Sequence, residues 1–455
     1  MMLKKKKNCI YGKLRSARER IRHSHAVETA RRLAAPFRVN PFPPQVFLVL
    51  LYRLILDVLY LKIVFPLFAY MGFTAYLQLD FYAFTLLVLL IFAPFIARLQ
   101  EEKSASAAIL TFLHYIYFIP FTSYCACSGA PLTFFLIGSV YWAIMLLIQF
   151  RLPVIYLQPM QTRRTQRIYC LLTLLGVAFV MFISWRYTGL RFTLDFINVY
   201  DIRAEAASYQ MPKIFSYALS MMSVLLAILL MYWMIRRKRV VVGTLIVVFL
   251  FLFSIEAHKS QFFFLLLVLS AYFFYRPWML RWAGGLMIIF ASGALAEWLI
   301  LDSYYLAAYF FRRMMYTPML LSEACMRLFQ DNPLNLFRVG IMGKLSFDEI
   351  YSINIPYLVA ESFGGKNSAN TGLLGDMFAN LPTPLGIILM PIILVVCFRI
   401  MDATAHHLPQ KLTISACLFF AMSFSNSSWS TVLLSHGFLL ACLLFYFFPK
   451  EETLT

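Results

Sequence analysis

Charged residues are scarce in this chain: only 13% of its 455 residues are Asp, Glu, Lys or Arg, whereas 61% are apolar. Soluble globular domains contain about 25% charged residues. The scarcity of charge therefore excludes an ordinary soluble domain and places the chain in the membrane class. Apolar runs long enough to cross about 30 Å of hydrocarbon recur along its whole length. We predict an all-α polytopic membrane protein.

Motifs that hold metals and cofactors are also missing from the sequence. The eight cysteines are scattered without the spacing of a zinc site. We find no glycine-rich dinucleotide fingerprint, no P-loop, no Asp-x-Asp pair and no Ser-His-Asp order. We therefore expect no metal and no cofactor. Any catalysis would rest on cationic side chains and one base.

The apolar runs predict about twelve transmembrane helices. They follow a basic tail over residues 1–45, and one membrane domain would fill residues 46–455. The predicted spans lie near 46–70, 79–98, 107–124, 131–150, 168–184, 214–235, 240–255, 262–275, 283–301, 384–400, 412–429 and 431–448.

The positive charge is distributed unevenly between the two sides of this predicted bundle. The formal net charge is +19, but nucleic-acid binding would need the basic residues gathered on one water-facing surface. If the spans alternate, 27 of the 40 Lys and Arg lie on one side, 11 on the other and two inside the first span. The basic side faces the cytoplasm. We predict that both termini are cytoplasmic, that the tail touches anionic lipid, and that nucleic acid is not a partner.

Two loops on the other side are long enough to hold chemistry, at residues 185–213 and 302–383. The first half of the second loop, 304–329, is helical in propensity and apolar over much of its circumference. It would lie along the membrane or pack into the bundle, with a kink or break at Pro318. The second half is rich in Gly, Asn, Pro and Ser, which predicts turns and coil.

Arg312 and Arg313 stand in the second loop. Consecutive residues point about 100° apart on a helix, so one can face a ligand while the other reaches a lipid headgroup. Both could simply anchor the loop to headgroups. Arginines on the less basic side run against the charge bias, however, and the planar guanidinium suits phosphate.

The polar turn 254–261 separates two short apolar runs and contains Glu256, His258 and Lys259. It is either a plain hairpin loop or the lining of a cavity below the membrane surface. The ordinary pKa of histidine makes His258 a plausible base near neutral pH.

The stretch "KNSANTGLLGDMFANLP", residues 366–382, lies between apolar segments. Irregular polar backbone is not tolerated in contact with lipid. The stretch is either a surface turn or a loop that folds back toward the 254–261 turn and the Arg312 helix. We predict the second arrangement. Hydrogen bonds would come from Ser368, Asn370 and Thr371, close backbone approach from Gly372, and a carboxylate from Asp376.

Two motifs in this order give a resemblance. The sequence "FFRRMMYTP" (310–318), followed by "SANTGLLGDMFANLPTPLG" (368–386), resembles the Wzy-type polymerases that join oligosaccharide repeat units of bacterial O-antigen and capsular polysaccharide. The segment "AHKS" (257–260) is similar to a feature of the same family. The resemblance covers the C-terminal half best and, through span number and two large loops, the rest loosely.

The resemblance implies an O-antigen-polymerase-like or GT-C-like bundle in the bacterial inner membrane, with both large loops in the periplasm. The substrate would be an oligosaccharide linked to undecaprenyl pyrophosphate, and the growing chain would be transferred as a block. A chain-length regulator protein is a further expected partner. The proposed roles of the residues are proton removal by His258, Asp376 or Glu256, pyrophosphate binding by Arg312, Arg313, Lys259, Arg191 and Arg203, and glycan binding by Ser368, Asn370, Thr371 and Gly372.

Several alternatives stay open at this point. Asp195, Asp201 and Glu205 are also carboxylates that could act as the base, although we favour His258, with Asp376 either as its partner or as the group that orients an arginine. A ligase that transfers finished glycan would share the donor and the fold. A flippase or small-solute carrier would place charges near the bilayer midplane, where Arg53 and Asp57 are the main candidates.

Overall fold

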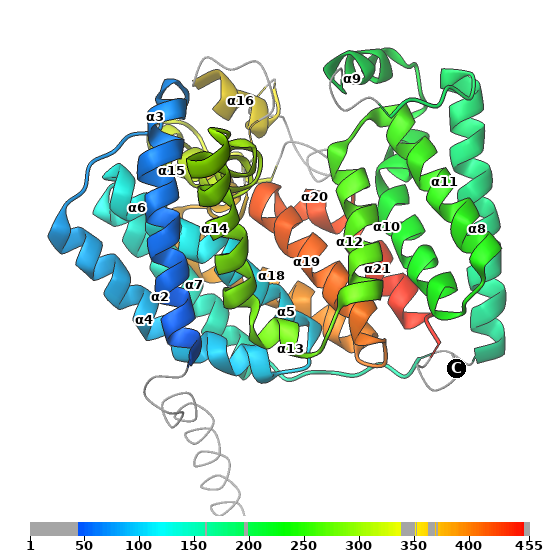
Figure 1. Ribbon diagram of the computed structural model, residues 1–455, viewed down its shortest axis with the longest axis horizontal. Coiled ribbons are helices and arrows are strands. Elements are labelled where there is room, and N and C mark those ends of the chain that lie inside the picture. Colours follow the sequence, from blue (N-terminus) through cyan, green and yellow to red (C-terminus); the bar gives the residue numbers. More distant parts are fainter. Residues whose placement is uncertain are drawn as a thin grey trace, which may run out of the picture.

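The computed structural model describes residues 44–159, 162–194, 199–337, 351, 353–362, 369 and 372–449. Within these ranges every regular element is a helix (Figure 1). The first half contains α2 (Pro44–Leu59), η2 (Tyr60–Val64), α3 (Phe65–Phe68), η3 (Ala69–Met71), α4 (Leu79–Glu101), α5 (Ala105–Leu113), η4 (His114–Phe118), α6 (Ile119–Ser128), α7 (Leu132–Arg151), α8 (Thr162–Ile183), η5 (Ser184–Thr188), α9 (Val199–Ser208) and α10 (Lys213–Ile235).

The second half continues in the same all-helical manner. It contains α11 (Arg239–Glu256), α12 (Lys259–Phe274), α13 (Trp278–Arg281), α14 (Ala283–Leu301), η6 (Ala307–Tyr316), α15 (Thr317–Asp331), α16 (Ile355–Ser362), α17 (Leu373–Asn380), α18 (Thr383–Ala405), α19 (Gln410–Asn426), α20 (Trp429–Leu433) and α21 (Phe438–Tyr446).

Nine helices of the described ranges are long and apolar enough to cross a membrane. The expectation of twelve spans is therefore supported only in part. Three predicted spans do not meet the same criterion. The helical run from α2 to α3 carries Arg53, Asp57 and Lys62, the helix Gln261–Phe274 is short, and α19 has 17 residues.

The exposure of the outer helices agrees with a membrane protein. Only 17% of the apolar window of α14 and 28% of that of α4 are buried inside the protein. Large apolar side chains such as Ile289 and Leu299, each 71% exposed, lie on the surface of α14. Such continuous apolar surface is unfavourable in water and stable in hydrocarbon.

The core is built around one central helical run, α5–η4–α6. In this run 94% of the apolar window is buried, and it packs against α2, α4, α18 and α19. Ser104 is the N-cap of α5, and its hydroxyl oxygen accepts a hydrogen bond from the backbone N–H of Ala107. This bond satisfies one of the backbone N–H groups that have no partner at the start of a helix.

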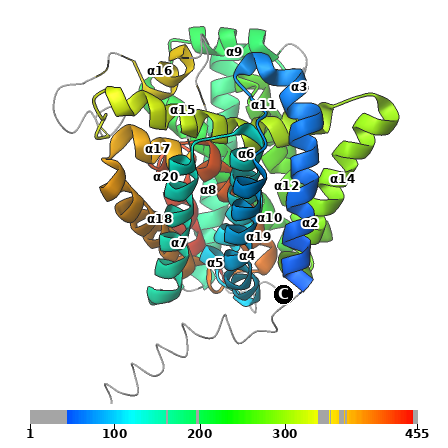
Figure 2. The ribbon, with the colours of Figure 1, turned by 90° about the vertical axis from the view of Figure 1, so that its left-hand side faces the viewer.

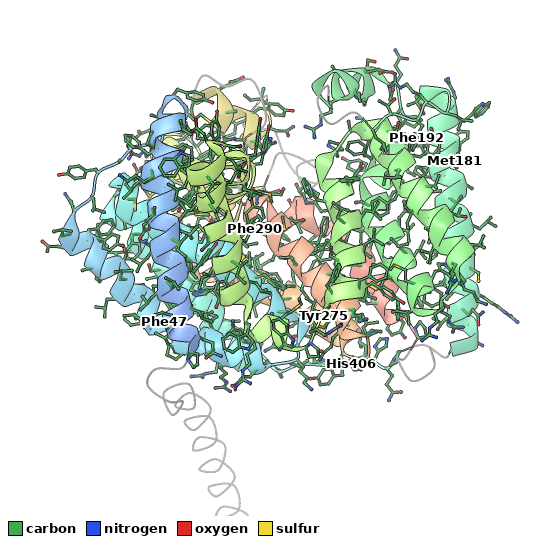
Figure 3. The ribbon with its side chains drawn as sticks, viewed as in Figure 1. Phe47, Met181, Phe192, Tyr275, Phe290 and His406 are labelled. Carbon is green, nitrogen blue, oxygen red and sulfur yellow. The ribbon has the colours of Figure 1, made fainter. Side chains whose placement is uncertain are left out.

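The bundle has two ends that are easily recognised in Figure 1. We call the end where α2 begins and α21 ends the basal end, and the end that bears α9 and α16 the distal end. Side chains labelled in Figure 3 mark the two ends: His406 lies at the basal end and Phe192 at the distal end.

The region predicted as the second long loop contains four helical elements. As expected, residues 304–329 are mainly helical, and α15 runs across the bundle rather than along it (Figure 2). The chain stays helical at Pro318, which occupies the first turn of α15, where proline is tolerated. The prediction of coil for the second half is wrong at residues 355–362, which form α16, and at residues 373–380, which form α17. α17 is helical because Leu373, Leu374, Met377 and Phe378 bury one apolar face.

Candidate functional site

The break between α19 and α21 is where several of the predicted site residues approach one another. We call residues 425–437, "SNSSWSTVLLSHG", the junction segment. Its serines and Asn426 favour a helix end over a continuous helix, and Gly437 takes a left-handed conformation (φ 75°) at the start of α21. Both predicted spans 412–429 and 431–448 run into this polar segment.

Gly372 and α17 contact the first part of the junction segment. A Cβ atom added to Gly372 would lie 2.0 Å from the Ser425 carbonyl oxygen and 3.0 Å from the Asn426 backbone nitrogen. The backbone can approach so closely only because glycine has no side chain. Residues 372–380 are buried and pack against α15, α18 and α19, so this part of the stretch does lie inside the bundle. Its predicted approach to the 254–261 turn stays a prediction.

Asp376 anchors α17 to α20. Its Oδ2 accepts a hydrogen bond from the backbone N–H of Trp429 at 2.8 Å, and its Oδ1 accepts one from the side-chain amide of Asn380 at 2.9 Å. The carboxylate thus sits at the N-terminus of α20, where open N–H groups favour an anion. Burial raises the pKa of Asp376 to about 7, while the two hydrogen bonds act in the opposite direction.

Asn380 ties the same helix to the chain after α15. Its Oδ1 accepts hydrogen bonds from the Asn335 side chain at 2.7 Å and from the Phe337 backbone N–H at 2.9 Å. Its amide nitrogen donates to Asp376. Both ends of the Asn380 side chain are therefore used, and they fix α17 between α15 and α20.

The two arginines of η6 have different surroundings, as their spacing predicts. The Arg312 guanidinium lies 4.3 Å from the centre of the Phe68 ring, and one of its NH groups donates to the sulfur of Met71 at 3.3 Å. Its Nε is buried and has no hydrogen-bond partner among the described residues. Arg313 is exposed. In the described part of the chain neither arginine forms a salt bridge.

A buried polar network supports η6, the helix that carries the two arginines, through Tyr316 at its C-terminal end. The Tyr316 hydroxyl donates to the Leu56 carbonyl at 2.7 Å and lies 3.0 Å from Ser123 Oγ, which in turn donates to Asp57 at 2.6 Å. Asp57 forms a salt bridge with Arg53, and both residues lie in α2. The two charges named as carrier candidates therefore act as internal supports of η6.

The arginine helix also meets the junction segment. The Asn426 side chain donates to the Met314 carbonyl at 3.4 Å. Asn426 thus lies between η6 and Gly372, so the arginine helix and α17 border the same residue. A π-helix such as η6 is rare in proteins and is frequent at functional sites.

The third group of predicted residues lies at the turn between α11 and α12. Arg203 of α9 donates from Nε to the Ala257 carbonyl at 3.2 Å, and Glu256 accepts a hydrogen bond from Gln261. Loss of water around the imidazole, then the charge of Arg203 and the ring of His436, lower the pKa of His258 to about 4. His258 keeps an exposed edge and is neutral at pH 7.

Not every predicted residue joins this arrangement. Arg191 pairs with Glu205 at 2.7 Å on the α9 side of the bundle, and Asp376 contacts no arginine among the described residues. Ser368, Asn370, Thr371 and Asp195 lie outside the described residues, as do the side chains of Lys259 and Asp201. The structure therefore leaves the predicted glycan contacts of the first three untested.

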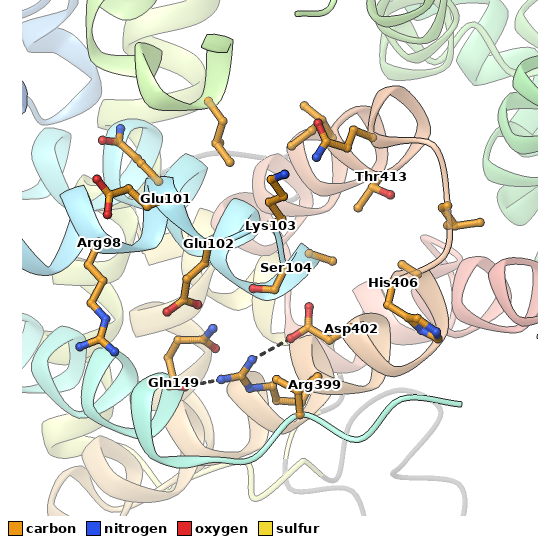
Figure 4. Close-up of a pocket in the computed structure, with 18 of the residues that line it drawn as sticks. Arg98, Glu101, Glu102, Lys103, Ser104, Gln149, Arg399, Asp402, His406 and Thr413 are labelled. Carbon is orange, nitrogen blue, oxygen red and sulfur yellow. Dashed lines mark hydrogen bonds and ion pairs between the residues drawn. The ribbon is translucent and has the colours of Figure 1, made fainter. Parts of the chain in front are cut away.

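Two sets of polar residues were not singled out from the sequence. Asn426, Trp429 and His436 of the junction segment were counted as parts of spans, although four serines within six residues signalled a break. A second set lines a cavity of about 1270 Å³ at the basal end (Figure 4). Its members come from the ends of several helices, so no local sequence pattern reveals them.

Comparison with models of protein families, with curated proteins and with solved structures gives no match. Among the described residues, no three His, Cys, Asp or Glu side chains are grouped as a metal site would require. Around the junction segment and the α11–α12 turn, the described residues offer a pair of cations without a carboxylate partner, a neutral imidazole, and a buried carboxylate that fixes α17.

Proposed function

We propose that the protein is an inner-membrane glycosyltransferase that polymerises lipid-linked oligosaccharide repeat units. The donor would be a growing glycan on undecaprenyl pyrophosphate, and the acceptor would be a single repeat unit on a second carrier lipid. The motifs at 310–318 and 368–386 resemble those of Wzy-type polymerases, and in the fold both motifs border the junction segment. The distal end would then face the periplasm.

The observation that carries the proposal is the arginine pair of η6. Arg312 and Arg313 are consecutive, and neither has a carboxylate partner in the described chain. Two neighbouring guanidinium charges without a counter-charge favour an anionic ligand. Pyrophosphate is the anion released when such a donor reacts.

The proposed transfer step exchanges one bond at the anomeric carbon and moves one proton. An acceptor hydroxyl oxygen forms a bond to the anomeric carbon of the donor glycan, and the bond from that carbon to the pyrophosphate oxygen breaks. The lipid pyrophosphate leaves with the electron pair, and the hydroxyl proton passes to a base. Charge that develops on the leaving group is stabilised by preorganised cations, which is the role we assign to Arg313 with Arg312.

His258 is the better candidate for the base. Its pKa of about 4 leaves it unprotonated at neutral pH but also makes it a weaker base than free imidazole. The choice therefore rests on access, because part of the His258 side chain is exposed. Both oxygens of Asp376 already accept hydrogen bonds that fix α17. Asp376 is therefore assigned to positioning, and the expectation that it orients an arginine finds no contact among the described residues.

Purified protein mixed with an authentic lipid-linked repeat unit in detergent tests the proposal. A polymerase should convert the single repeat unit into a ladder of longer glycans, although no membrane is present to be crossed. A matched reaction with Arg313→Ala should give a much shorter ladder. Unchanged substrate with the wild-type protein, at several detergent concentrations, would overturn the polymerase assignment.

A lipid-linked oligosaccharide carrier is the second candidate, and the basal cavity is the observation that favours it. A carrier needs polar space that opens toward each side of the membrane in turn. Such a protein would leave the repeat unit unchanged in detergent and would move it across the bilayer of a vesicle. The same substrate therefore distinguishes the two candidates.

A further inference from the structure

The helical run that contains η6 begins directly after α14. Only Asp302, Ser303 and Tyr304 separate the last residue of α14, Leu301, from the next helical residue, Tyr305. Asp302 takes a left-handed backbone conformation (φ 47°) at the end of α14. A connection of three residues keeps the start of the arginine-bearing helix close to the last turns of α14.

Glu297, near the C-terminal end of α14, binds this start with its carboxylate. Its Oε1 accepts hydrogen bonds from the Tyr305 backbone N–H and from the Ser303 hydroxyl, each at 2.9 Å. Its Oε2 accepts one from the Leu306 backbone N–H at 2.8 Å. The first N–H groups of a helix have no partner within the helix, and this end favours a negative charge. Glu297 therefore holds the first turn of the run with charge-assisted hydrogen bonds.

A second contact between the same two helices lies just before the arginines. The ring of Phe290 in α14, labelled in Figure 3, packs against Phe310 with 4.5 Å between centroids and against Phe311 with 5.4 Å. Phe290 and Glu297 are seven residues apart, a spacing that places both on one face of α14. This face of α14 thus contacts η6 at its start and again immediately before the arginine pair.

The other end of η6 is also fixed. The Tyr316 hydroxyl donates to the Leu56 carbonyl at 2.7 Å, so the arginine pair lies between two anchored ends. At the start of the run, three hydrogen bonds converge on the one carboxylate of Glu297. A single substitution there can release one end of the helix while the other end stays attached.

We infer that Glu297 is a positioning residue for the arginine pair. By binding the start of the run, it sets where the two guanidinium groups are presented, although in the described chain it forms a salt bridge with neither. The importance of this position for glycan transfer rests on the proposed function, whereas the position itself does not. Displacement of a positioned group by about 1 Å can lower a rate by about 10²-fold.

Distances between two nitroxide spin labels, measured by pulsed EPR on the full chain in detergent, test the inference without a substrate. Cys170 is exposed, whereas the other described cysteines are buried, so it carries one label, and Arg313→Cys carries the other. Cys9→Ser removes the remaining thiol. We expect a narrow distance distribution in this parent protein. Glu297→Ala should broaden it about twofold, because the first turn of the run opens locally.

A reference pair distinguishes a local release from a general loss of stability. It joins Cys170 to Leu132→Cys at the start of α7, where Leu132 is 52% exposed. Glu297→Ala should leave this second distribution unchanged. Broadening of both pairs to the same extent would mean that Glu297 stabilises the fold as a whole and would overturn the positioning role.

Ser303→Ala provides the matched control, because it removes one hydrogen bond to Glu297 and leaves both backbone N–H groups in place. It should keep the narrow distribution of the parent. Glu297→Gln retains one acceptor oxygen and should broaden the distribution less than Glu297→Ala, which keeps the test decisive if the alanine variant folds poorly. Unchanged widths in both Glu297 variants, or equal broadening in Ser303→Ala, would overturn the inference.

Transfer kinetics in the native-cysteine background separate the inference from the proposed function. Per folded protein, Glu297→Ala should lower kcat about 10–100-fold and change the KM for the acceptor repeat unit little, and Ser303→Ala should change neither. A wild-type protein that makes no ladder, combined with the expected label distances, would overturn the polymerase assignment and leave the positioning role of Glu297 intact. A normal kcat in Glu297→Ala, together with an unchanged label distance, would overturn the positioning role and leave the polymerase assignment intact.

Discussion

The residues that seat α17 and the residues that line the basal cavity use buried polar groups in different ways. Both oxygens of Asp376 and both ends of Asn380 have partners within the protein. In the basal cavity, Gln149 and Arg399 each keep a buried atom without a partner among the described residues. The first arrangement is satisfied by its own chain and fixes helices, whereas the second keeps a donor and an acceptor unsatisfied. Buried polarity in a membrane bundle is therefore not by itself a sign of a ligand.

Removal of the arginine pair of η6 should have the largest effect. Arg313→Ala should lower the rate of glycan transfer by about 10²–10³-fold, the usual loss when one donor to a developing negative charge is removed. Arg312→Ala should cost less, because its side chain packs on Phe68 and Met71. Polymer length and rate, measured at equal protein level, check both. Normal ladders from both variants would leave the arginines as headgroup anchors.

Gly372 offers the sharpest structural test of how α17 is seated. Gly372→Ala would put a methyl group 2.0 Å from the backbone oxygen of Ser425, and backbone cannot rotate away as a side chain does. Overpacking of this kind costs about 1–3 kcal/mol or more. We expect a clear drop in the thermal midpoint in detergent.

Gly375→Ala is the matched control for that substitution. Its added Cβ would meet Ser322 Oγ at 3.4 Å, which is ordinary contact, and alanine is favoured over glycine inside a helix by about 1 kcal/mol. The thermal midpoint should be unchanged or higher. Equal destabilisation by both substitutions would contradict the close approach of Gly372 to α19.

Asp376→Asn should destabilise the fold by about 1–3 kcal/mol, as expected when a buried donor loses its acceptor. The Trp429 N–H and the Asn380 amide both donate to Asp376. Asparagine has only one acceptor oxygen, so in either orientation one donor faces an NH₂ group. The thermal midpoint of the variant measures the loss. A variant as stable as the wild type would show that one of these hydrogen bonds is dispensable.

The pH dependence of transfer separates the two candidate bases. A base works when it is unprotonated, so activity is lost as pH falls through its pKa. With His258 at about 4, the rate should stay nearly constant from about pH 8 down to about pH 5. With Asp376 at about 7, the rate would already fall tenfold per unit below neutrality. Initial rates in buffers of constant ionic strength decide between them. If His258 is the base, His258→Gln should lower the rate strongly at every pH from about 5 to about 8.

Features encoded in long or local stretches of sequence could be predicted, whereas contacts between residues far apart in the sequence could not. Composition and long apolar runs predicted a helical membrane bundle, and the polarity of 366–382 located a segment that folds inward. The helix at 373–380 was missed because its glycine and asparagine suggested coil, whereas burial of Leu373 and Phe378 decided the outcome. Gln149 and Arg399 of the basal cavity lie 250 positions apart, and no local pattern can bring such residues together.

The smallest expected effect belongs to Gln149, and it tests the comparison from the basal side. Gln149→Leu removes a hydrogen bond to Ser106 at 2.8 Å, but it also removes a buried oxygen that has no partner in the described chain. The first change costs about 1 kcal/mol and the second returns a similar amount, so the thermal midpoint should move by no more than a few degrees. A large loss of stability would mean that Gln149 supports the fold as Asp376 does, and the contrast between the two side chains would disappear.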